Sequence, residues 1–198
     1  MTSESLNGPW KRVCDKEPLI QISPDENAFD SYLCNNPAFI KSPDGRYYLY
    51  YKGRSIADNK NNRVIRRIGV AISDHLEGPY VKYSGNPILD HSPKDSEDPF
   101  IWYEDGKFKM LMHDISIFEH GSGLYFESLD GLHWSEPGRG YPSVREMTGN
   151  KEDDRLETPM LLLKDGKPDY LYCNRASHTR AYLNNPEKAQ YTSFLFKV

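Results

Sequence analysis

Acidic and amide side chains stand at three matching points of the sequence, each immediately before a proline. The three pairs are Asn35-Asn36 before Pro37, Glu97-Asp98 before Pro99 and Glu157-Thr158 before Pro159. Carboxyl groups that converge on one place repel one another when ionised, and this repulsion raises their affinity for protons, as does partial burial. A carboxyl group that keeps its proton at neutral pH can act as a general acid. The pattern therefore indicates acid–base chemistry, provided that the fold brings the three points together.

Each pair also has an ordinary structural explanation. Asn-Pro and Asp-Pro favour the start of a turn, and a polar residue before a strand commonly satisfies backbone donors. That explanation is the better one for any single pair, whereas acids or amides at all three points favour a functional polar cluster. Glycoside hydrolysis is one reaction that needs two acids, about 6.5–9.5 Å apart for inversion and about 5–5.5 Å apart for retention.

Three repeated segments must position these pairs. They are NPAFIKSPDGRYYLYYKG (36–53), DPFIWYEDGKFKMLMHD (98–114) and TPMLLLKDGKPDYLYCN (158–174). Each segment reads as a polar residue, proline, an apolar run, Asp-Gly and a second run, and the starting points are 62 and 60 residues apart. Asp-Gly between β-forming runs is a strong hairpin signal, because both residues tolerate the positive φ of a tight turn. Each segment is therefore expected to form a β-hairpin.

Further strand-like stretches accompany the hairpins. Residues 66–83 place a Gly-Pro after an apolar strand, residues 3–13 contain Gly-Pro in the same setting, and residues 123–134 give a looser counterpart. Four strands per roughly 60 residues, with turn residues at fixed offsets, are typical of propeller blades. Helical periodicity is almost absent, and only residues 186–191 could hold a helical turn.

The predicted fold is all-β, with one partial β-propeller domain over residues 1–198 and about three four-stranded blades of a five-bladed ring. The approximate repeats are 30–90, 91–145 and 150–198, and residues 1–20 would end an upstream blade. Three blades cannot close a ring, so strand edges and apolar faces would be exposed unless something covers them. The chain is therefore expected to be the C-terminal portion of a longer propeller, or part of an assembly completed by further copies or a partner chain.

Composition limits the partners of the chain. It has 198 residues, with 25 basic and 29 acidic side chains, and it lacks the dense basic block that binding to nucleic acid or an anionic membrane requires. No apolar run approaches the roughly 20 residues of a membrane span, and no signal peptide is evident. At face value this predicts a cytoplasmic protein, or a secreted or periplasmic one if the N-terminus is truncated. Cys14, Cys34 and Cys173 are interpreted as buried thiols, and neither a metal nor a cofactor is expected.

The residues GVAISDHLEGPYVKYSGNPIL leading to SEDPFIWYEDGKFKMLMHD (69–114), followed by LETP (156–159), give the chain a family resemblance. It resembles the five-bladed β-propeller glycoside hydrolases, and is most similar to the family 43-like and family 117-like sequences, over essentially its whole length as the last three blades. The resemblance implies that Asp98 is the aspartate that tunes the acid and that Glu157 is the general acid.

The resemblance also implies a difference from the family. The catalytic base would stand about two repeats before Asp98, upstream of Met1, and Asn36 is an amide that cannot abstract a proton. The chain is therefore expected to lack the base and to be poorly active alone. In family 117-like enzymes the acid is a histidine, for which His113 and His178 are candidate substitutes.

Several further residues are candidates for contacting a sugar. The residues proposed to bind substrate are Asn36, Glu97, Trp102, His113 and Arg175, with Tyr103 and Phe118 as additional stacking surfaces. Aromatic residues on strands more often belong to the core, and His113-Asp114 and Asn174-Arg175 could equally form salt bridges or caps. Residues 128–134 resemble an Asp-box turn, which is a structural element. The cluster Arg63, Arg66 and Arg67 is either solvated or a clamp for an anion or carboxylate.

Two functions of different classes remain at this point. The first is a glycoside hydrolase that inverts configuration and acts on a plant or algal polysaccharide fragment, with Glu157 as acid and Asp98 modulating it. The second is a noncatalytic carbohydrate-binding or scaffolding propeller fragment that associates through its open edges.

Overall fold

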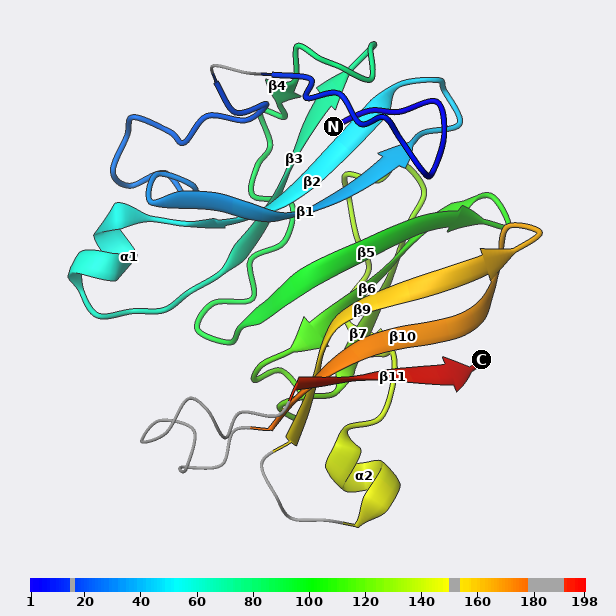
Figure 1. Cartoon of the computed structure of the whole chain (residues 1–198). Helices are drawn as coiled ribbons and strands as arrows, with labels where there is room; N and C mark the ends of the chain where they lie inside the picture. The colour runs from blue at the N-terminus through cyan, green and yellow to red at the C-terminus, as the bar shows by residue number, and fades with distance from the viewer. Residues whose placement is uncertain (15–16, 150–153, 178–190) are drawn as a thin grey trace.

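Three antiparallel sheets make up the computed structural model, which describes residues 1–14, 17–149, 154–177 and 191–198. The first sheet contains β1 (Leu33–Lys41), β2 (Tyr47–Arg54), β3 (Arg67–Ser73) and β4 (Val81–Lys82), in that order. The second contains β5 (Ser96–Glu104), β6 (Lys107–Asp114), β7 (Gly123–Ser128) and β8 (Gly138–Arg139). The third contains β9 (Asp154–Lys164), β10 (Lys167–Ser177) and β11 (Tyr191–Lys197). The first strands of the sheets, β1, β5 and β9, lie side by side (Figure 1).

The three repeated segments form the predicted hairpins β1–β2, β5–β6 and β9–β10. At Asp105-Gly106 and Asp165-Gly166 both turn residues have positive φ, which is the geometry of a tight turn between twisted strands. The β1–β2 turn is longer, because Lys41 pairs with Tyr47 across a five-residue loop. The predicted hairpins are therefore confirmed, and the fold is the all-β arrangement of propeller blades, with three strands in the third sheet among the described residues.

Two short helices correct the expectation that helical structure could occur only at residues 186–191. Helix α1 (Ile56–Lys60) and helix α2 (Val144–Thr148) lie in loops that connect strands. Ser55 caps α1 by accepting a hydrogen bond from the backbone N–H of Asp58, and Ser143 forms a capping box with Glu146. Capping thus makes single helical turns that have too few residues to show periodicity. Residues 186–190 lie outside the described part of the chain.

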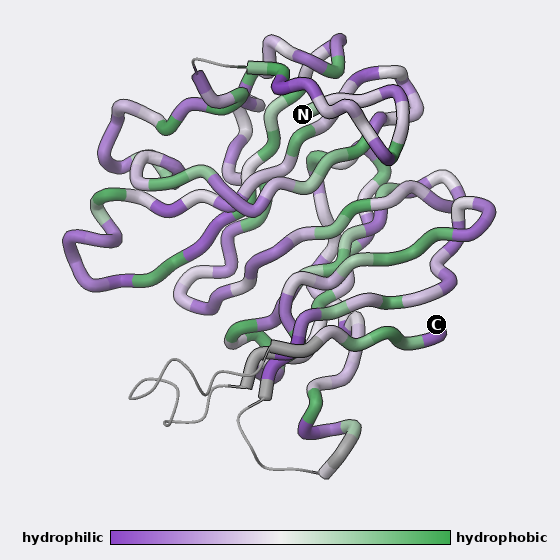
Figure 2. Tube along the Cα trace, in the orientation of Figure 1, coloured by the Kyte–Doolittle hydropathy of each residue, from purple (hydrophilic) through white to green (hydrophobic). Residues whose placement is uncertain are grey.

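The core consists of two apolar layers, one between each pair of neighbouring sheets. The layer between the first and second sheets contains Tyr48, Tyr50, Val70, Phe108, Met110 and Phe126, and the layer between the second and third contains Trp102, Leu111, Leu156, Leu171 and Cys173. Apolar segments accordingly occur on strands of all three sheets in Figure 2. Face-to-face packing of successive sheets around a line of inner strands is the arrangement of a propeller.

The Asp-box-like turn joins the first two sheets. The Asp130 carboxylate accepts hydrogen bonds from the backbone N–H groups of Leu132 and His133, at 2.8 and 2.9 Å. The buried Tyr50 hydroxyl donates to the Gly131 carbonyl oxygen at 2.9 Å, and Trp134 packs edge-on against the Tyr50 ring. The turn therefore has the structural role expected for it.

The N-terminal stretch 3–13 was expected to form outer strands of a blade. Over residues 1–14 the structure shows one β-bridge, between Thr2 and Lys11. Among the described residues, no helix has the length and apolar character needed to cross a membrane.

Candidate active site

Three β-bulges bring the polar residues before the prolines together. Asn36, Asp98 and Thr158 have positive φ values of 49°, 59° and 49°. The strand register shifts at each of them, and the proline that follows has no N–H to donate to the ladder. A bulge changes the direction of the side chains that precede it. Because β5 lies between β1 and β9, the bulge of β5 faces the other two.

Asp98 is the point at which the three bulges meet. The Asn36 amide Nδ2 donates a hydrogen bond to Asp98 Oδ1, and the backbone of Thr158 lies beside the Asp98 carboxylate, where it favours the ionised form. The Thr158 hydroxyl oxygen in turn accepts a hydrogen bond of 2.7 Å from the Asn174 side chain. The sequence-based expectation that matching repeat positions become neighbours therefore holds for Asn36, Asp98 and Thr158.

A cavity of about 430 Å³ follows the inner strands from these bulges. Asn36, Asp98 and Thr158 form its polar end. The prolines after them and the side chains of Phe39, Phe100, Ile101 and Met160 complete the lining. A cavity with converging polar groups at one end and apolar walls is the usual form of a small-ligand site.

Glu97, the residue before Asp98, forms ion pairs with two cationic side chains. Lys52 Nζ lies 2.6 Å from Glu97 Oε2, and Arg66 Nε lies 2.9 Å from the same oxygen. Arg66 also pairs with the Asp95 carboxylate. His113 Nδ1 is 3.9 Å from Glu97 Oε1. Glu97, predicted to contact substrate, is therefore part of an ion-pair network.

Burial and charge move the proton affinities of this cluster in different directions. Burial raises the pKa of Asp98 above the usual aspartate value, and the negative charge of Glu97 adds to the increase. Burial would also raise the pKa of Glu97, but Lys52 and Arg66 outweigh it and hold that pKa below its usual value. Burial lowers the pKa of His113 to about 3, so its imidazole is neutral at physiological pH. His113 is therefore unsuited to replace a glutamic acid as proton donor.

Glu97, Asp98 and His113 offer ligand atoms for a metal ion, but two neighbouring cations oppose the binding of one. Ligand atoms of Glu97, Asp98 and His113 lie within 4.8 Å of one another, and neither ring nitrogen of the buried His113 has a hydrogen-bond partner among the described residues. A cation placed there would face the charges of Lys52 and Arg66, which already neutralise Glu97. The contacts fit an ion-pair network better than a cation site.

Glu157 lies at the third bulge, next to the residue whose backbone contacts Asp98. Its partner across the β9–β10 ladder is Asn174, and its side chain is half-buried. Arg155 Nη1 lies 3.6 Å from Glu157 Oε1 and 2.9 Å from His120 Nε2. The two acids assigned by sequence therefore come from adjacent inner strands.

Other sequence candidates lie elsewhere. Trp102, predicted to stack on a sugar, is buried in the core between the second and third sheets, where its Nε1 donates to Glu104. Its burial corrects that expectation, because a ring enclosed by protein cannot stack on a ligand. Arg175, on β10, lies over the Phe194 ring at 5.9 Å.

The structure also places three of the remaining candidates, Asp114, Phe118 and Tyr103. Asp114 accepts hydrogen bonds from the backbone N–H groups of residues 117–119, which is the capping role considered for it. His178 lies outside the described residues. The exposed Phe118 contacts the Arg139 guanidinium, whereas Tyr103 packs edge-on against Phe108.

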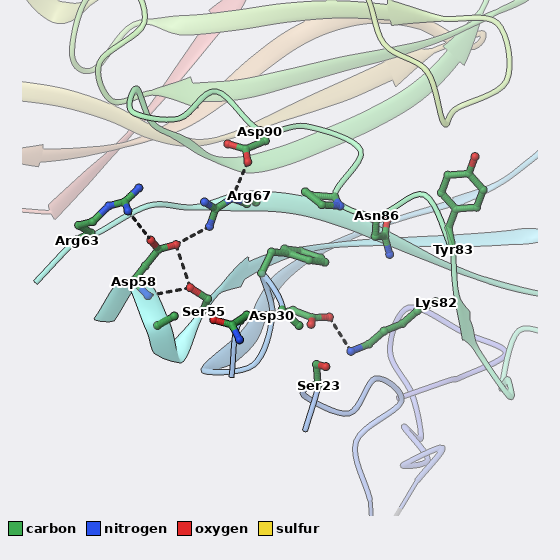
Figure 3. A pocket seen from close by; sticks show the side chains of 15 residues that line it. Ser23, Asp30, Ser55, Asp58, Arg63, Arg67, Lys82, Tyr83, Asn86 and Asp90 are labelled. Atoms are coloured by element: carbon green, nitrogen blue, oxygen red, sulfur yellow. Dashed lines mark hydrogen bonds and ion pairs between the residues drawn. The ribbon is translucent and has the colours of Figure 1, made fainter. Parts of the chain in front are cut away.

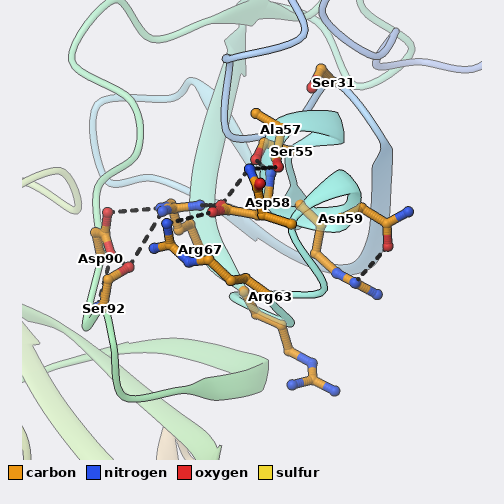
Figure 4. A network of polar contacts seen from close by, with 12 residues as sticks. Ser31, Ser55, Ala57, Asp58, Asn59, Arg63, Arg67, Asp90 and Ser92 are labelled. Carbon is orange, nitrogen blue, oxygen red and sulfur yellow. Dashed lines mark hydrogen bonds and ion pairs between the residues drawn. The ribbon is translucent and has the colours of Figure 1, made fainter.

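A larger cavity, of about 560 Å³, lies beside α1 and is lined by charged side chains (Figure 3). Arg67 contacts the carboxylates of Asp58 and Asp90, both at 2.7 Å (Figure 4). Lys82 contacts Asp30 at 2.6 Å (Figure 3). Arg67 and Arg66 are thus clamps for internal carboxylates, one of the two roles considered for the arginine cluster, whereas Arg63 is mostly exposed. Because these charges are paired within the protein, the cavity needs no ligand to explain its charged lining. The ion pair between Arg67 and Asp58 joins β3 to α1.

Lys52 and Arg66 were not predicted as parts of the site. The available signal was local: Lys52 lies inside the strand YYLYYKGR, before the terminal Arg54, where a buried cation needs a carboxylate partner. The identity of that partner depends on packing between sheets, which the strand pattern does not give.

Successive antiparallel sheets packed around inner strands that meet at paired acids define a β-propeller of the glycoside hydrolase class. The chain belongs to the family of the glycosyl hydrolases family 32 N-terminal domain, whose model matches residues 16–191. It is also 31% identical to an extracellular endo-α-(1→5)-L-arabinanase of Thermotoga petrophila, over 69% of this chain and 30% of that protein.

Solved structures share the fold. A family 117 glycoside hydrolase of the marine bacterium Zobellia galactanivorans superposes with a TM-score of 0.69 at 17% identity, covering 98% of this chain and 49% of that one. A thermostable family 43 glycoside hydrolase gives 0.56 at 17% identity, over 87% and 54% of the two chains. The catalytic domain of a Coprinopsis cinerea family 62 α-L-arabinofuranosidase gives 0.52 at 10% identity, over 90% and 50%. The expected resemblance to the propeller glycoside hydrolases is therefore confirmed, and the chain spans about half the length of these structures.

Replacing Lys52 by methionine should lower the free energy of unfolding by about 3 kcal/mol at pH 7, because it leaves a buried carboxylate with one cation in place of two. The pKa of Glu97 is lowered in the folded state, so its stabilising contribution is present above the unfolded pKa and is lost as the pH falls through the lowered folded value. The deficit should therefore shrink in acid. Urea unfolding at pH 7 and at about pH 3 measures both effects.

The matched control is Lys60→Met, which removes the exposed pair with Glu26 and should cost at most about 1 kcal/mol. Equal losses in the two variants at pH 7 would contradict the burial and pairing of Glu97.

Proposed function

We propose that this chain contributes the acid side of a glycoside hydrolase active site that acts on a plant or algal polysaccharide. Glu157 serves as the general acid and Asp98 modulates it. The observation that carries the proposal is the contact of Asp98 with both neighbouring bulges, one residue from Glu157. The similarity to an endo-α-(1→5)-L-arabinanase supports an arabinose-containing polymer as the substrate to test first.

The proposed reaction begins with protonation of the glycosidic oxygen by Glu157 as the bond to the sugar breaks. An ionised Asp98 close by raises the proton affinity of Glu157 by like-charge repulsion, so that the acid is protonated before it reacts. Asn36 fixes the orientation of Asp98 through its amide. A water molecule attacks the opposite face of the sugar, which inverts the configuration.

The base that activates this water is proposed to come from outside the 198 residues. Asn36 occupies the equivalent position one blade before Asp98, and an amide cannot take a proton from water. A further part of the propeller, supplied by upstream blades of the same protein, by another polypeptide or by a second copy, would have to provide a carboxylate.

The third sheet has a surface that such a further part could cover. Met160, Tyr172 and Leu195 are adjacent across β9, β10 and β11, and all three are exposed. A row of apolar side chains on a sheet face is a common site of protein association. This surface also supports the alternative function, a noncatalytic carbohydrate-binding or scaffolding fragment, which would bind sugar independently of Asp98 and Glu157.

Replacing Glu157 by glutamine, in a preparation that contains a complete propeller, should reduce hydrolysis of an arabino-oligosaccharide by about 10²–10⁴-fold, because the leaving oxygen is no longer protonated. The loss should be smaller on a nitrophenyl glycoside, whose leaving group departs without protonation. Initial rates on both substrates measure the difference, with the exposed Glu136→Gln as a control expected to behave as wild type. Wild-type turnover by the Glu157 variant would remove this residue from the mechanism.

The 198-residue chain alone should form dimers or larger species, because the apolar row on the third sheet is open. Light scattering on gel-filtered protein measures the mass. Replacing Met160 and Leu195 by glutamate should shift the distribution toward monomer. A monodisperse wild-type monomer would contradict completion by association, and ready hydrolysis of the oligosaccharide by this chain would contradict the external base.

A further inference from the structure

Glu97 and Asp98 are consecutive residues whose carboxylates nevertheless lie close together. In a regular strand, neighbouring side chains point to opposite faces of the sheet. The bulge at Asp98, with its φ of 59°, breaks this alternation. Oxygen atoms of the two side chains consequently lie within 4.8 Å of each other. Two acids at this distance in a partly buried site must influence each other's ionisation.

Glu97 and Asp98 have different neighbours: cations surround the first and neutral groups the second. Glu97 contacts Lys52 and Arg66, whereas the neighbours of the Asp98 carboxylate are the neutral Asn36 amide, which donates a hydrogen bond to it, and the Thr158 backbone. The titratable and charged groups around them are Lys52 from β2, Arg66 before β3, Asp95 before β5, His113 from β6, His120 after β6, Tyr141 after β8, and Arg155 and Glu157 from β9. His113 and Tyr141 are neutral at physiological pH, since burial lowers the pKa of the first and raises that of the second.

We propose that Glu97 is a positioning residue: its carboxylate, kept ionised by Lys52 and Arg66, sets the pH at which Asp98 loses its proton. Both cations contact the same oxygen of Glu97, Oε2, so Glu97 stays an anion while its carboxylate remains close enough to Asp98 to oppose a second charge. Lys52 thus acts on Asp98 in two ways, by keeping Glu97 ionised and by offsetting part of its field.

The consequence for catalysis rests on the function proposed above. Asp98 can raise the proton affinity of Glu157 only when Asp98 is itself ionised. Glu97 would therefore move the acidic limit of activity toward neutral pH. The electrostatic coupling between Glu97 and Asp98 does not depend on turnover, so it can be tested separately.

The test is an NMR titration of the Asp98 carboxyl carbon in protein labelled with ¹³C-aspartate, assigned with an Asp98→Asn variant. The wild-type midpoint should lie above the usual aspartate value. Glu97→Gln should shift the midpoint to lower pH, because it removes the opposing charge without changing the shape of the side chain. Lys52→Met should shift it to higher pH, because Glu97 stays ionised through its pair with Arg66, its charge is less screened, and the direct attraction between Lys52 and Asp98 is lost.

The matched control is Glu104→Gln at the other end of β5, where Glu104 pairs with Lys109 in the same manner, and it should leave the midpoint unchanged. An unchanged or raised midpoint in Glu97→Gln would overturn the proposal. Should that variant not fold, a wild-type midpoint at or below the usual aspartate value overturns the proposal without any variant. If the midpoints move as expected but Glu157→Gln retains full activity, the coupling stands and the proposed function fails.

Discussion

The contact of Asp98 with its neighbours on both sides is the interaction on which the site depends. A carboxylate between β1 and β9 can reach the Asn36 amide and the Thr158 backbone only because all three strands bulge at the same level. The bulges put these residues in a region of φ that costs free energy for side chains other than glycine. The favourable packing of the three sheets compensates for that cost. The geometry of the site therefore depends on the alignment of the blades.

The buried carboxylates away from the cavity are satisfied in two ways. Asp58 and Asp30 are paired with the cations Arg67 and Lys82, whereas Asp114 accepts backbone hydrogen bonds. Glu97 is paired in the same way, whereas Asp98 is left with neutral donors and a raised pKa. Raised proton affinities are common at functional sites and also occur within ion-pair networks, as at Asp95, where burial raises the pKa although Arg66 acts against it.

The repeats in the sequence predicted the hairpins and the meeting of the residues that precede the prolines, because Asp-Gly turns and the spacing of the X-Pro pairs depend on local chemistry and on a regular period. The bulges at these residues were not predicted. Helix α1 could not be predicted in the same way, since one turn capped by Ser55 has no periodicity. Trp102 was misplaced because strand alternation does not say which face another sheet will cover. The partners of Glu97 were missed for the related reason that Lys52 and Arg66 come from a different blade.

The most direct test of the central interaction is a double-mutant cycle that combines Asn36→Ala with Asp98→Ala and measures the free energy of unfolding at pH 7. A hydrogen bond from the Asn36 amide to an ionised Asp98 predicts a coupling of about 1.5–3 kcal/mol between the two substitutions. Additive losses, within about 0.5 kcal/mol, would show that the two side chains do not interact and would contradict the convergence of the inner strands on Asp98.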